Sequence, residues 1–277
     1  MKNLSSSRIL ALLAAGVFGS LAHAGVPLNN LEGAGGVAFN PLAYTAGQNK
    51  DVSTPWNLDI VSKPQIGAWY VSLPDVDVDW VTAGGAVTWF NRLETSVGRE
   101  VIAKDTWDNI HKTNFGAKLL VVKENDFDTT WVPAVSAGLV YKDVNYSALG
   151  GKEHGTDFYL VATKLITQLP APVLVSGGVI STQGYATGAL GFDSSHDEAL
   201  FLNVDVVLFT QFAAGVEYRQ GAEFSAVKNA DYYDVHAAWF ATKQLTLVGA
   251  YVDTGDETSS SKVGLGDGFV LSAQYAF

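Results

Sequence analysis

The residues of this 277-residue sequence that are best suited to chemistry are charged side chains set between apolar neighbours. Histidine is central among them, because its charge changes close to neutral pH and its ring can accept or donate a proton. With carboxylates and basic groups it could form a structural ion-pair network, a charge filter for solutes or an acid–base site. The candidate residues are Arg92, Glu94, Lys118, Asp205, Glu217, Arg219, Asp234 and His236.

Patterns for covalent, metal or phosphate chemistry are weak in this sequence. A nucleophile and its base must lie within hydrogen-bonding reach, and His236 has no serine two residues away. The acidic segments His196–Glu198 and Asp253–Glu257 lack the spacing of a calcium-binding loop. The run Gly33–Gly36 is not followed by the Lys-Ser or Lys-Thr pair of a phosphate loop. We therefore expect no enzymatic activity, no cofactor and no bound metal.

The composition of the chain is more apolar than that of a typical soluble protein. Hydrophobic residues make up 48% of it and charged residues 16%, whereas a soluble domain has about 25% charged residues. The net charge of −11 argues against nucleic-acid binding, which needs a basic surface. The absence of cysteine excludes disulfides and thiolate metal sites. Such a composition is typical of one large buried core or of a protein embedded in a membrane.

The first 24 residues have the pattern of a secretory signal peptide. Lys2 and Arg8 precede the apolar stretch Ile9–Phe18, and an Ala-x-Ala cleavage motif ends at Ala24. We predict export with cleavage after Ala24, so that residues 1–24 are removed from the mature protein. No later segment reaches the length of about 20 apolar residues that a membrane-spanning helix needs. If the exported chain crosses a membrane, it must therefore do so with β-strands.

Apolar and polar residues alternate with a period of two along most of the remaining chain. In the last nine residues, Phe269, Leu271 and Tyr275 share one face, whereas Ser272 and Gln274 lie on the other. The same alternation predicts strands near residues 65–73, 79–90, 92–102, 113–122, 131–142, 157–167, 172–182, 199–209, 212–220, 231–241, 245–252 and 269–277. Most have the length of about 9–11 residues expected of a tilted membrane-spanning strand. We predict an all-β fold, a transmembrane antiparallel up-and-down β-barrel of about 12 strands (range roughly 10–14), over residues 64–277.

The connections between these segments alternate between short turns and longer polar loops, as in outer-membrane barrels. Long loops are expected at residues 103–112, 143–156, 183–198, 221–230 and 253–268. The short-turn side, which also holds both ends of the barrel, is expected to be periplasmic.

Aromatic residues on the apolar face fall into two groups. One lies beside the short turns and comprises Trp89, Trp131, Phe212, Trp239 and Phe277. The other lies beside the long loops and comprises Tyr141, Tyr218, Tyr233, Tyr251 and Phe269. Two aromatic girdles are expected where a barrel meets the two membrane interfaces. A soluble β-sandwich would explain the alternation but not the paired girdles.

Residues 25–63 precede the first strand and lack its alternation. They are rich in glycine and asparagine and contain prolines, yet Val37, Phe39, Leu42, Tyr44 and Trp56 make them too apolar for a plain linker. We predict that this segment folds into the barrel mouth or lumen as a plug. A strap across the periplasmic rim and disorder are the alternatives.

Two N-terminal stretches, Gly25–Gly33 and Gly36–Tyr44, resemble the mature N-terminus of a family of Gram-negative exported outer-membrane β-barrel proteins, a domain of unknown function. Lys63–Leu73 and Phe90–Glu94 look like further segments of the same family. This resemblance implies a location in the outer membrane and a barrel fold, and it implies no catalytic activity. The terminal Phe277 resembles the signal by which the barrel-assembly machinery recognises outer-membrane proteins.

A barrel of about twelve strands lies between two regimes: eight-stranded barrels are filled by side chains, whereas barrels of about sixteen strands leave an aqueous channel. We expect a narrow pore or passive channel for small solutes in the outer membrane of a Gram-negative bacterium. The alternative is a non-conducting structural or interaction barrel, and an outer-membrane enzyme ranks third. The expected partners are outer-membrane lipid, the barrel-assembly machinery and small solutes.

Overall fold

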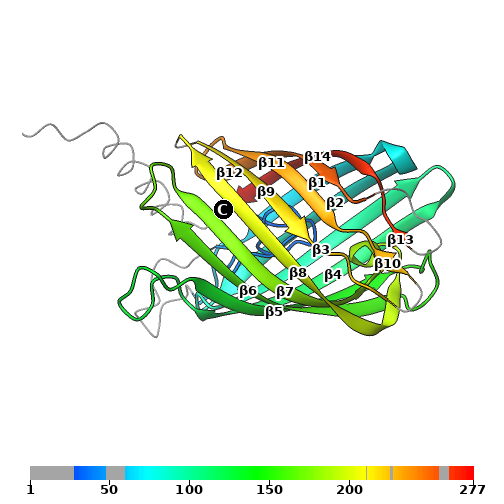
Figure 1. The fold of residues 1–277 in the computed structure, drawn as a ribbon, viewed down its shortest axis with the longest axis horizontal. Helices are drawn as coiled ribbons and strands as arrows, with labels where there is room; N and C mark the ends of the chain where they lie inside the picture. Colours follow the sequence, from blue (N-terminus) through cyan, green and yellow to red (C-terminus); the bar gives the residue numbers. More distant parts are fainter. Residues whose placement is uncertain (1–27, 48–59, 210, 225–226, 256–261) are drawn as a thin grey trace, which may run out of the picture.

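The computed structural model describes residues 28–47, 60–209, 211–224, 227–255 and 262–277. Within this part of the chain, twelve strands form one closed antiparallel barrel (Figure 1). They are β1 (Gln65–Leu73), β2 (Val78–Trp89), β3 (Leu93–Lys104), β4 (Trp107–Val122), β5 (Ala134–Val144), β6 (His154–Ile166), β7 (Val173–Gly184), β8 (Phe192–Leu208), β9 (Phe212–Arg219), β11 (Tyr232–Phe240), β12 (Leu245–Asp253) and β14 (Asp267–Ala276). The predicted twelve-stranded barrel is confirmed. The predicted signal peptide, residues 1–24, lies outside the described residues.

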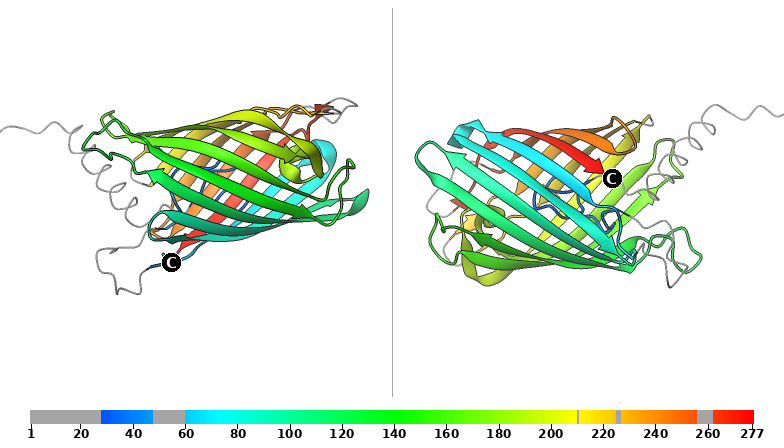
Figure 2. Two further views of the ribbon diagram at one scale, coloured as in Figure 1. Left: turned by 90° about the horizontal axis from the view of Figure 1, so that it is seen from below. Right: turned by 180° about the vertical axis from the view of Figure 1, so that it is seen from behind.

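The barrel closes because its first and last strands pair with each other. β1 and β14 are antiparallel, with Gln65 opposite Ala276 and Ser72 opposite Phe269. Each remaining barrel strand pairs with its neighbours along the chain, which gives the up-and-down topology visible in both views of Figure 2. Closure leaves no strand edge with unpaired backbone groups, as a membrane interior requires.

Alternate residues of each strand face outward and inward, as the period-two pattern predicts. In β11 the side chains of Tyr233, Val235 and Trp239 are exposed, whereas Asp234 and His236 are buried. The exposed side chains on the outer wall are largely apolar, and many of the buried ones are polar. The barrel is therefore apolar on the surface that meets lipid and polar over much of its interior.

The connections at the two rims differ in length, although less regularly than expected. One rim, here called the short-turn rim, lies at the ends of β2, β4, β6, β8 and β11 and holds the C-terminus. At the opposite long-loop rim β1, β3, β5, β7, β9 and β12 end. The short strands β10 (Lys228–Asn229) and β13 (Lys262–Val263) pair in parallel at the long-loop rim. The 3₁₀ turns η1 (Pro74–Val76) and η2 (Tyr185–Gly188) lie there too. Among the described residues, no helix is long and apolar enough to cross a membrane.

Two of the predicted loops are shorter than the sequence pattern suggests. The expected loop 103–112 is wrong, because β3 and β4 continue until only Asp105 and Thr106 connect them. Similarly, β8 begins at Phe192 instead of near residue 199. In the extension of β4 the buried residue is Ile110, whereas Asp108 and Asn109 are exposed, so the outward residues are no longer apolar although the backbone pairing continues.

The aromatic residues of the two expected girdles lie on the outer wall or at its rims. Trp131 precedes β5 instead of belonging to it, and it is the most exposed of the ten at 82%. Tyr218 is only partly exposed, and its ring packs against that of Tyr233. The other members of both groups are exposed, and Phe212 stacks on Trp239. These positions are compatible with two girdles, whose membrane contacts stay a prediction.

The long-loop half of the lumen contains an apolar core. Trp69, Leu73 and Trp80 of β1 and β2 belong to it, together with Ile102 and Ile110. The connection between β7 and β8 folds inward and adds buried residues to the same cluster, among them Tyr185, Ala186, Ala189 and Leu190. This half of the barrel is therefore packed with side chains.

Candidate functional site in the barrel lumen

Residues 28–47, here called the N-terminal segment, lie within the barrel and appear in blue between the strands (Figures 1 and 2). Most of them are buried. A tight turn shapes its first part: the side-chain oxygen of Asn30 accepts hydrogen bonds from the backbone N–H groups of Glu32 (3.1 Å) and Ala34 (3.0 Å). Asparagine favours such local turns, because its side chain can replace a backbone acceptor.

Glycines allow this turn to approach the barrel wall closely. Gly33 has a φ of +88°, a conformation that residues with a side chain rarely adopt. A Cβ atom at Gly33 would lie 2.6 Å from the carbonyl oxygen of Val97, and one at Gly98 would lie 2.5 Å from the carbonyl oxygen of Glu32. The backbones of the segment and of β3 are in contact because both lack side chains at these points.

Gly98→Ala is therefore expected to push the N-terminal segment away from the wall. Overpacking of this kind destabilises a protein by about 1–3 kcal/mol, so the variant should lose heat resistance in detergent, measured by the heat-dependent shift in gel migration. Gly249→Ala is the matched control, because the nearest atom to its added Cβ is 4.0 Å away on Leu271. Equal stability of the two variants would contradict a close contact between segment and wall.

One buried lysine holds the backbone of the N-terminal segment at three points. The ammonium group of Lys118 donates to the carbonyl oxygens of Gly35 (2.9 Å), Leu42 (3.1 Å) and Tyr44 (2.7 Å). Its charge is balanced by Glu94 on the neighbouring strand, whose Oε2 lies 3.1 Å from Lys118 Nζ. Both side chains are only 1% exposed, and a buried charge needs such a partner.

Two carboxylates accept hydrogen bonds from N–H groups of the same segment. Glu94 accepts from Gly35 (2.9 Å) and Ala46 (2.7 Å). On the opposite side of the lumen, Glu217 of β9 accepts a hydrogen bond from the N–H group of Phe39 (2.9 Å). The wall therefore binds the segment largely through its backbone polar groups.

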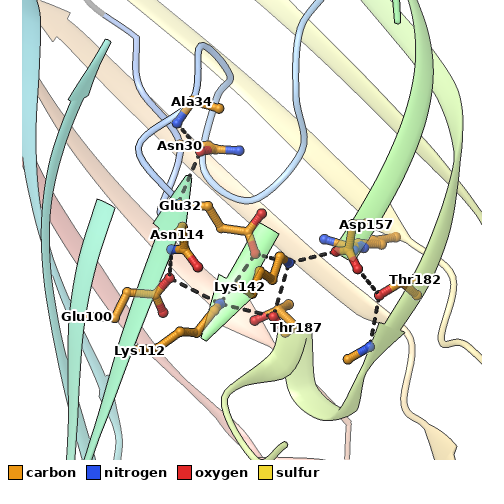
Figure 3. Close-up of polar contacts among 12 residues, drawn as sticks. Asn30, Glu32, Ala34, Glu100, Lys112, Asn114, Lys142, Asp157, Thr182 and Thr187 are labelled. Carbon is orange, nitrogen blue, oxygen red and sulfur yellow. Dashed lines mark hydrogen bonds and ion pairs between the residues drawn. The ribbon is translucent and has the colours of Figure 1, made fainter. Parts of the chain in front are cut away.

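A second set of buried charges surrounds the only carboxylate of the described segment (Figure 3). This set, here called the Glu32 cluster, comprises Glu32, Glu100, Lys112, Lys142, Asp157 and Arg219. Lys112 Nζ lies 3.4 Å from Glu32 Oε1 and 3.1 Å from Glu100 Oε1. Lys142 Nζ pairs with Glu32 and lies 2.6 Å from Asp157 Oδ2. Three basic groups thus face three carboxylates, which balances the charge of the cluster.

The Glu32 cluster also ties the inward-folded β7–β8 connection to the wall. The carbonyl oxygen of Thr187 accepts from Lys112 at 2.9 Å and from Lys142 at 3.1 Å. Both lysine side chains are fully buried. Burial alone would raise the pKa of Glu32, but the positive charges of Lys142, Lys112 and Arg219 outweigh it and hold the pKa at about 2. Glu32 is therefore ionised at neutral pH.

A histidine between two carboxylates forms a third group of lumen charges. His236 Nδ1 lies 2.7 Å from Asp234 Oδ1, and His236 Nε2 lies 2.6 Å from Asp205 Oδ1. Both ring nitrogens thus face carboxylate oxygens, an arrangement that a protonated imidazole satisfies with two N–H donors. Glu217 lies directly opposite Asp234 on the paired strand. These four residues are here called the His236 cluster.

The structure brings most of the predicted site residues together, in three separate groups. Arg219 lies 3.8 Å from Asp157 and so belongs to the Glu32 cluster. Arg92 lies apart from all of these charges, because it donates to backbone carbonyl oxygens at the end of β4. The place of Arg92 in a lumen charge network stays a prediction.

Sequence reasoning missed five members of the Glu32 cluster: Glu32, Glu100, Lys112, Lys142 and Asp157. Lys112 falls in a segment predicted to be a loop, and the others lie near predicted strand ends or in the segment without periodicity. A usable signal existed for two of them. Glu100 is six residues from Glu94, and Lys112 is six residues from Lys118, so each shares the inward face of its strand.

The described part of the barrel encloses cavities, of which two bear on these clusters. The larger, of about 430 Å³, occupies the short-turn half and is lined by Asp205 and His236 among mostly apolar residues. The smaller, of about 70 Å³, lies in the long-loop half and is lined by Asp234 among apolar residues. The His236 cluster therefore contributes to the walls of both, and the N-terminal segment also lines both.

The fold is similar to that of solved outer-membrane porins. The KdgM porin matches with a TM-score of 0.54 at 12% identity, over 77% of this chain and 99% of that chain. The same porin in complex with disordered oligogalacturonate gives 0.54 at 11% identity, over the same shares of the two chains. The NanC porin gives 0.52 at 9% identity, over 77% of this chain and 100% of that chain. At such identities the likeness concerns the fold of an outer-membrane β-barrel alone.

No curated protein matches the sequence. A family model does, over residues 25–274, which is nearly the whole chain after the predicted signal peptide. The resemblance noted in the N-terminal stretches thus extends through the barrel. The chain belongs to DUF3034, a family of proteins of unknown function.

Proposed function

We propose that this protein is a channel for small solutes in the outer membrane, closed by its own N-terminal segment and opened when that segment shifts. The observation that carries the proposal is the way residues 28–47 are held. Inward side chains of the wall bind them mostly through hydrogen bonds to the backbone. Export by cleavage after Ala24, assembly through Phe277 and a periplasmic short-turn rim belong to the same proposal.

Polar attachment suits a segment that has to leave its site. A hydrogen bond within a protein adds only about 0.5–1.5 kcal/mol net, because water replaces the lost partner. If the segment withdrew, side chains such as Lys118, Glu94 and Glu217 would line a wet passage. A barrel with a purely structural role needs no charged side chains in its interior, where apolar filling avoids the cost of burying them.

A second candidate is the non-conducting barrel, and one observation favours it. The long-loop half is filled by Trp69, Leu73 and Trp80 of the wall together with the inward-folded β7–β8 connection. Withdrawal of the N-terminal segment alone would leave this filling in place. The channel proposal therefore requires that the β7–β8 connection also shifts once Glu32 leaves the lysines that bind Thr187.

A reversible disulfide between segment and wall tests the proposal, since the native chain has no cysteine. A Cβ atom at Gly67 would lie 3.5 Å from Cβ of Asn29, which suits a disulfide. In planar bilayers we expect wild-type protein to open intermittently. The oxidised Asn29→Cys/Gly67→Cys variant should stay closed, and reducing agent should restore its openings.

The matched control joins two wall strands without touching the segment. Ser96 and Gly116 face each other on β3 and β4, and a Cβ at Gly116 would lie 3.6 Å from Cβ of Ser96. The oxidised Ser96→Cys/Gly116→Cys variant should conduct like the wild type. A wild-type protein that never conducts would support the non-conducting barrel instead, and unchanged openings in the locked variant would exclude the segment as the gate.

A further inference from the structure

The larger cavity has the shape and lining of a small-molecule site. Its volume of about 430 Å³ lies within the range of roughly 300–1,000 Å³ found for ligand pockets. Asn91 and Lys123–Asn125 belong to short-turn connections, so the cavity extends to that rim. Its apolar lining includes Leu42, Leu165, Leu174, Val207, Phe240 and Val248.

Asp205 and His236 of the His236 cluster both line this cavity, and Asp205 is the more exposed of the two. Its side chain is 13% exposed, whereas those of His236 and Asp234 are 1% exposed. Asp205 Oδ1 pairs with His236, and its Oδ2 accepts from the amide of Asn203. A carboxylate with each oxygen engaged only once can still accept a further donor from the cavity.

The surroundings of Asp205 carry an excess of negative charge. Asp205, Asp234 and Glu217 are three carboxyl groups around one imidazole. Even when His236 is protonated and two carboxyl groups share a proton, one negative charge is left over. Two basic groups of the lumen are engaged elsewhere, because Lys118 pairs with Glu94 and Arg219 lies 3.8 Å from Asp157.

The charged groups at the mouth of the cavity do not reverse this balance. Glu124 pairs with Lys164 at 3.2 Å and accepts a hydrogen bond from the Tyr44 hydroxyl. Lys123 also lines the cavity, but it is exposed at the rim, where solvent and salt screen its charge. The inner part of the cavity is thus apolar on most sides and anionic on one.

We propose that this cavity binds an organic cation with an apolar body. Its ammonium group would donate to Asp205, and its hydrocarbon or aromatic part would lie among the leucine and valine side chains. A carboxylate ligand would be repelled by Asp205, and a neutral apolar molecule would remove water from Asp205 without supplying a charge. The binding site itself does not depend on the proposed function. That the bound cation is also the solute of the channel rests on the proposed function.

Binding can be measured in detergent with full-length protein, by calorimetric titration of benzylamine, benzyl alcohol and benzoate against a micelle blank. We expect benzylamine to bind at least about tenfold more tightly than benzyl alcohol and benzoate not to bind measurably. Asp205→Asn should weaken benzylamine about tenfold and leave benzyl alcohol unchanged. Ala238→Leu, which fills the cavity from its wall, should weaken both.

Asp128→Asn is the matched control, because Asp128 is exposed at the same rim and does not line the cavity. The inference is overturned if the amine and the alcohol bind equally, if Asp205→Asn leaves the amine affinity unchanged, or if Ala238→Leu changes neither affinity. If the barrel binds benzylamine but never conducts, the channel proposal is overturned and the binding site is supported. If it conducts but does not bind benzylamine, the binding site is overturned and the channel proposal is supported.

Discussion

Replacing Lys118 with methionine is expected to destabilise the barrel by about 3–5 kcal/mol, the loss typical when one partner of a buried ion pair is removed. Methionine has a similar length but carries no charge, so Glu94 would remain buried without a cation. Three carbonyl oxygens of the N-terminal segment would also lose the hydrogen bond from the ammonium group. The midpoint of thermal unfolding in detergent should fall accordingly.

The same variant should also open the channel, because the segment loses the side chain that holds it at three points. A longer open time in planar bilayers is therefore expected from Lys118→Met. Lys243→Met is the matched control: Lys243 is exposed in the turn between β11 and β12, and its loss should change neither stability nor conductance.

A double variant separates the charge from the hydrogen bonds. Glu94→Gln/Lys118→Met removes both charges of this ion pair, so neither is left without its partner, and we expect it to recover part of the stability that Lys118→Met loses. The segment carbonyls still lack the hydrogen bond from the ammonium group in the double variant, and its open time should stay long. If the double variant is no more stable than Lys118→Met, the loss of stability in Lys118→Met does not come from leaving Glu94 without a cation.

The fold could be predicted because lipid contact imposes one rule on every strand. Each residue that faces lipid must be apolar over the height of the membrane, so the period of two is visible in the sequence without knowledge of the partner strands. The same rule explains the errors. Above the membrane the outer face of β4 meets polar surroundings. The extension that carries Lys112 therefore lacks apolar residues at alternate positions, and the sequence pattern predicts a loop there.

The candidate site could be predicted only in part, because a period of two gives the face of a residue and not its partner across the lumen. Asp205 and His236 lie on nearby strands and are both opposite Gly215, so alternation and strand order suffice to group them. Glu32 is 80 residues from Lys112 and 110 residues from Lys142. Its position depends on how the N-terminal segment turns inside the barrel, which no local pattern determines.

Glu32→Gln is expected to make the stability of the barrel less dependent on pH in acid. The pKa of Glu32 is about 2 in the folded protein, against an ordinary value of 4.5. Since the folded pKa is the lower one, the ionised carboxylate stabilises the fold above pH 4.5, and this contribution is lost as the pH falls towards about 2. A difference of this size corresponds to about 3 kcal/mol at neutral pH.

Because other carboxylates also titrate in acid, the measurement is the gap in unfolding midpoint between wild type and Glu32→Gln. At pH 7 we expect a wide gap, since the glutamine leaves Lys112 and Lys142 in a cluster with one excess positive charge. The gap should narrow below pH 4.5 and nearly close at pH 2. Asp128→Asn, at an exposed position, should show no gap at either pH. A gap that stays constant between pH 7 and pH 2 would mean that the charge of Glu32 does not hold the segment, and that its packing alone does.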